Sequence, residues 1–244
     1  MSLVVTVYVQ EGIVMAADSR LTLNAQEKLG DTTVSNLAVG LSDSNYKLFL
    51  APHGIGISTC GDAAVAGVPI AGYVESFIAS TLQTESESVE SVARALLDHF
   101  RAFDPVPSCQ FHVAGYSRGA GRIEQEVWEV QIRPGEMSRM NPPGQQGASW
   151  SGESDIVSRL ILPLARVDAD GTVLERLPMH QIPWQFFTLQ DAIDFAVFAI
   201  RSTSDAIRFL PRAKTVGGPI DVLVIKPSGA AWVQRKELRV DSPG

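Results

Sequence analysis

Ser2, the second residue of the chain, could act as a nucleophile once the preceding methionine is removed. A serine hydroxyl attacks poorly unless a base takes its proton. A free α-amino group has a pKa of about 7.7–8.0, so part of it is neutral near neutral pH and can be that base. Loss of Met1 would give Ser2 both groups, and methionine aminopeptidases tolerate so small a side chain. The N-terminus therefore predicts a serine that carries its own base and needs no propeptide.

Other residue types that support catalysis or metal binding form no local cluster. The two cysteines, Cys60 and Cys109, are far apart and form no CxxC motif. The four histidines include no HxxxH pair. We therefore predict reduced core cysteines, no metal site and no cofactor.

Composition narrows the class of protein. The 244 residues are 45% hydrophobic and 19% charged, which is ordinary for a soluble globular chain able to bury a substantial core. The net charge of −7 argues against nucleic acid or anionic membranes as partners. No apolar run reaches the roughly 18 residues that span a bilayer, and the start lacks the basic region of a signal peptide. We expect a cytoplasmic protein whose residues 1–244 form a single domain.

Hydrophobic periodicity predicts alternating groups of strands and helices. Strand-like runs are joined by tight turns, which favours antiparallel pairing, and 22–45 reads as a short strand pair or a loop. Regions 141–149 and 168–184 read as irregular, and Pro163 should kink or shorten the helix over 155–167. The expected strands are 3–9, 12–18, 46–51, 54–60, 110–116, 123–132, 219–225 and 230–235, and the expected helices are 62–82, 87–103, 155–167 and 188–210.

This order predicts an α+β fold. Paired helices between groups of antiparallel strands suggest two sheets packed face to face, with helices on both outer faces. The expected architecture is a four-layer α-β-β-α sandwich.

The chain resembles the N-terminal nucleophile hydrolases, in particular the proteasome β-subunit family and its bacterial proteasome-like members. GIVMAADSRLT is similar to the family's second-strand signature, and counting back from its first glycine places the family's catalytic first residue on Ser2. In YKLFLAPHGIGISTCGDAA, Lys47 matches the catalytic lysine and Gly61 follows at the family's spacing. The segments FHVAGYS, Ser151-Gly152 and VGGPIDVLVI resemble later family elements, so the likeness covers nearly the whole chain.

Two features depart from the family pattern. The nucleophile is usually threonine, and here it is serine. The family also places an aspartate shortly before its Gly-Gly strand, whereas PRAKTVGG contains no acid.

The resemblance implies a role for each matching residue. Lys47 would favour the Ser2 alkoxide and keep the amine neutral, Asp18 would hold Lys47 charged, and the Gly61 N–H would bind the oxyanion, a contribution of roughly 3–4 kcal/mol. Ser151 would hydrogen-bond near the amine. The implied substrate-binding residues are Arg20, which braces that corner, Thr22, which binds the substrate backbone, Asn45 at the wall of the specificity pocket and Thr59 at its floor.

The implied function is a peptidase that cleaves peptides or unfolded proteins inside a homo-oligomeric ring, with an ATPase unfoldase as a possible partner. Apolar helical surface at 160–167 and 193–209 could bury against neighbouring subunits. Two alternatives stay open: a non-catalytic structural subunit of the same fold, and an amidase that acts on a small amide.

Overall fold

The computed structural model describes residues 2–29, 32–65, 67–82, 88–119 and 122–238. Two five-stranded sheets dominate it, and each is antiparallel throughout. The first has the strand order β12-β1-β2-β15-β16, formed by Gly147–Gly152, Leu3–Val9, Gly12–Ala17, Asp221–Lys226 and Gly229–Gln234. The second has the order β11-β10-β9-β6-β5, formed by Glu136–Arg139, Arg122–Gln131, Cys109–Gly119, Ile55–Gly61 and Leu48–Ala51.

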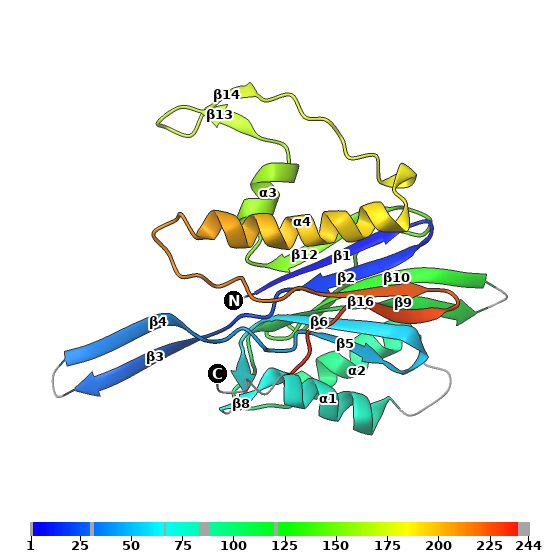
Figure 1. The fold of residues 1–244 in the computed structure, drawn as a ribbon, viewed down its shortest axis with the longest axis horizontal. Helices are drawn as coiled ribbons and strands as arrows, with labels where there is room; N and C mark the ends of the chain where they lie inside the picture. Colours follow the sequence, from blue (N-terminus) through cyan, green and yellow to red (C-terminus); the bar gives the residue numbers. More distant parts are fainter. Residues whose placement is uncertain (1, 30–31, 66, 83–87, 120–121, 239–244) are drawn as a thin grey trace, which may run out of the picture.

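Helices cover the outer face of each sheet (Figure 1). Helices α3 (Asp155–Ile161) and α4 (Leu189–Ile207) pack on the first sheet, whereas α1 (Ile70–Thr81) and α2 (Val89–Arg101) pack on the second. A third apolar cluster, which includes Val4, Met15 and Leu223, fills the space between the sheets. The described residues therefore form an α+β sandwich with two antiparallel sheets and four α-helices.

The remaining strands pair two by two outside the two large sheets. Strands β3 (Leu21–Leu29) and β4 (Thr32–Ser42) make a hairpin that projects from the body, and β13 (Ala165–Val167) pairs with β14 (Val173–Arg176) (Figure 1). Strands β7 (Ala64–Val65) and β8 (Val68–Pro69) precede α1, and the single-turn 3-10 helices η1 and η2 are Pro52–Gly54 and Trp184–Phe186. No helix in the described ranges is both long enough and apolar enough to cross a membrane.

Local sequence signals explain where the long helices begin. Ser88 caps α2 by accepting a hydrogen bond from the Ser91 N–H. Apolar residues recur at helical spacing on the buried face of α2. Thr188 and Asp191 form a capping box at the start of α4. Both helices were predicted, and the structure confirms them with slightly shorter bounds.

Three segments differ from the sequence-based predictions, and one predicted shortening is confirmed. The predicted helix 62–82 begins only at Ile70, because the β7–β8 hairpin uses the preceding residues. Helix α3 ends at Ile161, which confirms the predicted shortening by Pro163: proline disfavours a helical residue before it and has no N–H of its own. The predicted loop 141–149 joins strand β12 from Gly147, and the predicted irregular segment 168–184 contains β14.

Candidate active site

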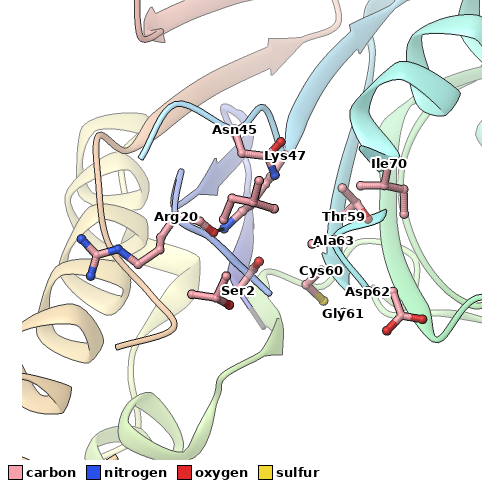
Figure 2. A pocket seen from close by; sticks show the side chains of 12 residues that line it. Ser2, Arg20, Asn45, Lys47, Thr59, Cys60, Gly61, Asp62, Ala63 and Ile70 are labelled. Carbon is pink, nitrogen blue, oxygen red and sulfur yellow. Dashed lines mark hydrogen bonds between the residues drawn. The ribbon is translucent and has the colours of Figure 1, made fainter. Parts of the chain in front are cut away.

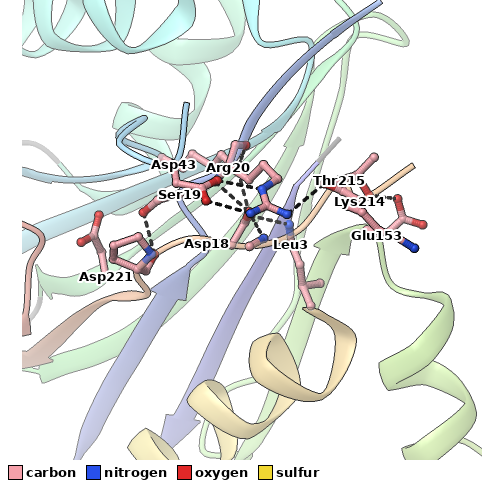
Figure 3. A network of polar contacts seen from close by, with 12 residues as sticks. Leu3, Asp18, Ser19, Arg20, Asp43, Glu153, Lys214, Thr215 and Asp221 are labelled. Atoms are coloured by element: carbon pink, nitrogen blue, oxygen red, sulfur yellow. Dashed lines mark hydrogen bonds and ion pairs between the residues drawn. The ribbon is translucent and has the colours of Figure 1, made fainter. Parts of the chain in front are cut away.

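Asp18 is the centre of the polar network at the end of β2, and its carboxylate is fully buried (Figure 3). Oδ1 accepts hydrogen bonds from the Leu3 N–H at 3.0 Å and from Lys47 Nζ at 2.9 Å. Oδ2 accepts from the N–H groups of Arg20 and Gly217, each at 3.1 Å. Because four donors surround it, Asp18 ties the residue after Ser2 to the lysine and to the segment that leads into β15.

Lys47 is also buried, with 3% of its side chain exposed. Its Nζ donates to Asp18 and, at 2.6 Å, to the carbonyl oxygen of Arg20. Burial lowers the Lys47 pKa from its ordinary value, and the Asp18 carboxylate opposes that shift. An ammonium has three donors, and these two bonds leave one for another group. These two bonds therefore hold the Lys47 ammonium in one orientation.

Seven of the nine predicted site residues line one pocket (Figure 2): Ser2, Arg20, Thr22, Asn45, Lys47, Thr59 and Gly61. Asp18 lies behind this pocket through its bond to Lys47. Cys60, Asp62, Ala63, Ile70 and Leu21 complete the lining. The pocket is formed by Ser2 just before β1, the β2–β3 connection with the start of β3, the β4–β5 connection, β6 with the residues after it, and the start of α1. Its residues therefore come from five separate places in the sequence.

The pocket is narrow, with a volume of about 10 Å³. That volume holds about one water molecule, so a larger group would fit only if the lining moved apart. Thr59 Oγ1 lies in this lining, is buried, and has no hydrogen-bond partner among the described residues.

Arg20 points away from Lys47 and toward the rim. Its guanidinium makes a two-pronged ion pair with Asp43, with both N–O distances at 2.7 Å. The pair raises the Arg20 pKa and lowers that of Asp43. Its guanidinium also packs against Gly217, where an added Cβ would overlap it at 2.6 Å. Arg20 therefore links Asp43 to the segment around Gly217 at this corner of the pocket.

Two glycines allow close approaches of the backbone near the pocket: Gly61 to Ser108 and Gly152 to Ser2. Gly61 has φ +104° and Gly152 has φ +98°, both in the region that favours glycine. A Cβ on Gly61 would overlap the Ser108 carbonyl oxygen, and a Cβ on Gly152 would overlap the Ser2 carbonyl oxygen. The Ser2 carbonyl itself accepts a hydrogen bond from the Glu153 N–H at 2.7 Å. The Ser2 carbonyl is thus held by the backbone of Gly152 and Glu153.

Replacing Gly152 with alanine should disturb Ser2 more than backbone strain alone would. Gly144 is the matched control, because its φ is +74° but no atom lies within 4 Å of its added Cβ. We expect Gly144→Ala to lower the free energy of unfolding by about 1–3 kcal/mol and Gly152→Ala to lower it further. Urea denaturation of both variants measures the difference. Equal losses would contradict the close approach to Ser2.

Ser151 does not line the pocket with the other predicted residues. It lies in β12, opposite Val4 in the register, and faces the second sheet. Its Oγ donates to Glu129 Oε1 at 2.7 Å and is 2.9 Å from His112 Nε2. His112 Nδ1 is 2.9 Å from Thr6 Oγ1. The four side chains form a polar chain between the sheets.

The sequence interpretation missed His112 and Glu129. His112 is the polar residue between Phe111 and Val113 in a strand, and such a residue at an inward position could have signalled a polar core. Full burial lowers the pKa of His112 to about 4. The ring is therefore neutral at pH 7. The acid bonds the hydroxyl and not the ring, so the set lacks the order of a serine hydrolase triad.

The buried His112 makes stability depend on pH. Between pH 6.5, its ordinary pKa, and about pH 4, the unfolded chain binds a proton at His112 that the folded chain does not. The free energy of unfolding should therefore fall by about 3 kcal/mol from this residue as the pH decreases through that window. Denaturation at a series of pH values, compared with His112→Gln, isolates this contribution. A parallel pH dependence in both proteins would contradict it.

An acid does reach the segment PRAKTVGG, from a place the sequence interpretation did not consider. Glu153, at the end of β12, accepts a hydrogen bond from Thr215 Oγ1 at 2.7 Å and pairs with Arg212 at 2.8 Å. Its own N–H binds the Ser2 carbonyl. Glu153 thus places a carboxylate next to the segment in which the expected aspartate is missing.

Met1, whose removal the sequence predicts, lies outside the described residues. Cys60 and Cys109 are both buried without a disulfide, as predicted, and burial raises the pKa of each thiol to about 12. Neither thiol is therefore a reactive thiolate at neutral pH.

Comparison with known proteins gives no assignment: no protein-family model matches this chain, and no curated protein matches it.

Proposed function

We propose that this chain is a peptidase of the proteasome β-subunit type, built on the N-terminal nucleophile hydrolase fold. Its nucleophile is Ser2, exposed by removal of Met1. The observation that carries the proposal is the shared pocket: Ser2, Lys47 and Gly61 line it together, and Asp18 anchors both Lys47 and the Leu3 N–H.

The reaction proceeds through an acyl-enzyme on Ser2. Oγ attacks the scissile carbonyl carbon while its proton moves to the α-amine of the same residue. The carbonyl oxygen becomes an oxyanion facing the Gly61 N–H, and the Lys47 ammonium stabilises the negative charge that develops on Oγ before attack. The C–N bond then breaks, and the amine returns the proton to the leaving group. Water hydrolyses the ester by the same steps in reverse.

The pocket dimensions suggest which peptides fit. The narrow cavity, which Thr59 helps to line, favours small side chains on the acyl side of the cleaved bond. On the other side of Gly61 and Gly152 lies a wider cavity of about 500 Å³, lined also by Gln110, Gln131 and Arg133. Because it shares Cys60 and Gly61 with the narrow pocket, it can accept the leaving half of the peptide.

The test is hydrolysis of fluorogenic peptides that carry alanine, leucine or arginine before the cleaved bond, alongside an intact-mass measurement of protein from its native host. We expect loss of Met1 and fastest cleavage after alanine. A mass that retains Met1 in most molecules would remove the amine base and reject the enzyme reading.

One observation favours a non-catalytic subunit of the same fold as the second candidate. The cavity of about 10 Å³ beside Ser2 is too small for any substrate side chain without movement. This candidate predicts no cleavage of any of the peptides, even after Met1 has been removed. An amidase acting on a small amide would instead cleave simple acyl amides faster than peptides.

The proposal includes assembly into a closed homo-oligomer. Large apolar side chains are exposed on and beside the helices of the first sheet, including Leu160, Leu162, Leu164, Phe198 and Phe209. We expect light scattering at micromolar concentration to give at least about six subunits, because closed rings bury such surface. A mass near the 26.3 kDa of one chain would contradict assembly.

A further inference from the structure

The polar chain between the sheets has a fixed direction, which follows from what each group can donate. A carboxylate only accepts, so the single Ser151 proton goes to Glu129 Oε1 at 2.7 Å. Ser151 Oγ must then accept from His112, which places the ring proton on Nε2. His112 Nδ1 is left as an acceptor for the Thr6 hydroxyl at 2.9 Å. Each of these three hydrogen bonds is therefore donated in the direction from Thr6 toward Glu129.

Glu129 is itself held in place, which keeps this direction constant. Its second oxygen, Oε2, accepts from Gln131 Nε2 at 3.0 Å. His112 is fully buried, and Ser151 is 6% exposed. The low dielectric around these groups strengthens each bond and makes a reversed arrangement costly. With its proton committed to Glu129, Ser151 has one lone pair left and can only accept from a further neighbour.

The strand register indicates that this neighbour is Ser2. Val4 lies opposite Ser151, and Leu3 lies opposite Gly152. Ser2 shares the face of Val4 and Thr6 because side chains alternate along a strand. It is therefore diagonal to Ser151, a separation that a direct or water-mediated hydrogen bond can bridge. The α-amine that Ser2 gains on removal of Met1 has N–H groups to donate.

We propose that Glu129 is a positioning residue for the proposed reaction: through Ser151 it provides a pure acceptor that orients the Ser2 amine. His112 donates to one of the two acceptor lone pairs of Ser151 and so prevents its hydroxyl from rotating. Glu129 touches no substrate, and its effect passes through Ser151. The inference rests on the proposed function for its kinetic consequence, but the direction of the hydrogen bonds does not.

The test combines kinetics with a spectroscopic readout. In Glu129→Gln the side-chain amide can donate to Ser151, which frees the hydroxyl proton to point elsewhere. We expect kcat for peptide hydrolysis to fall about ten- to thirtyfold with KM unchanged, as in Ser151→Ala. Thr6→Val is the matched control, because it breaks the far end of the chain and leaves both Ser151 partners in place. Its kcat should stay within about twofold of wild type.

Nitrogen NMR of protein with ¹⁵N-labelled histidine reports the His112 tautomer directly, assigned by comparison with His112→Gln. We expect a protonated Nε2 and an unprotonated Nδ1 in the wild-type protein. A protonated Nδ1, or equal kcat values for Glu129→Gln and Thr6→Val, would overturn the proposal. A wild-type protein without peptidase activity would instead reject the proposed function and this kinetic role together. The His112 tautomer would still show in which direction the hydrogen bonds from Thr6 to Glu129 run.

Discussion

Replacing Ser2 with alanine is expected to lower kcat/KM for peptide hydrolysis by at least about a thousandfold. The substitution removes the attacking oxygen and leaves the α-amine, Lys47 and Gly61 in place. No other hydroxyl lines the pocket at the position of Ser2; Thr22 and Thr59 come from different strands and carry no amine base. Without an acyl-enzyme, only direct attack by water remains.

The matched control is Ser2→Thr, which keeps the hydroxyl and the amine and adds one methyl group. We expect it to retain activity within about tenfold of wild type. Both variants leave a small residue after Met1, so removal of the methionine should be unaffected and can be verified by mass. Full activity in Ser2→Ala would show that the nucleophile is elsewhere.

Replacing Lys47 with alanine is expected to lower kcat/KM by at least about a hundredfold. The substitution removes the positive charge that stabilises the Ser2 alkoxide. It also leaves the fully buried Asp18 carboxylate without its cation, although three N–H groups still bind it. Negative charge near Ser2 would then oppose formation of a second one.

Lys47→Ala should also reduce stability, because loss of one partner of a buried ion pair costs about 3–5 kcal/mol. Assays must therefore be run where denaturation shows the variant to be folded. Lys226→Ala removes an exposed lysine at the end of β15 and serves as the control for charge alone. If folded Lys47→Ala matched Lys226→Ala in activity, Lys47 would be structural only.

The sequence predicted the parts of this molecule that local patterns encode. Strands β1 and β2 follow from their β-branched runs and the tight turn between them, and α4 follows from its apolar period and the Thr188 cap. Lys47 and Asp18 were paired in advance through a family resemblance, and the structure places them 2.9 Å apart. The two packed antiparallel sheets were also predicted, from the order of strands and helices.

Features that depend on pairing between distant strands were not predictable in this way. The contact of Ser151 with His112 and Glu129 requires β12 to face β9 and β10 across the sandwich, which no periodicity reveals. Glu153 reaches Thr215 only because the end of β12 lies next to the segment before β15. Strand β12 was not predicted, because the Pro/Gly-rich segment that leads into it indicated a loop.

The central claim is that Ser2 is an N-terminal nucleophile, and covalent labelling tests it most directly. Mature protein is treated with an electrophile that reacts with catalytic serine and threonine residues, such as a peptide epoxyketone that bonds both the hydroxyl and the free α-amine. Peptide mass mapping then locates the adduct. We predict a single adduct on Ser2 of chains that lack Met1 and none on Ser2→Ala. An adduct on another residue, or none on processed protein, would contradict the account.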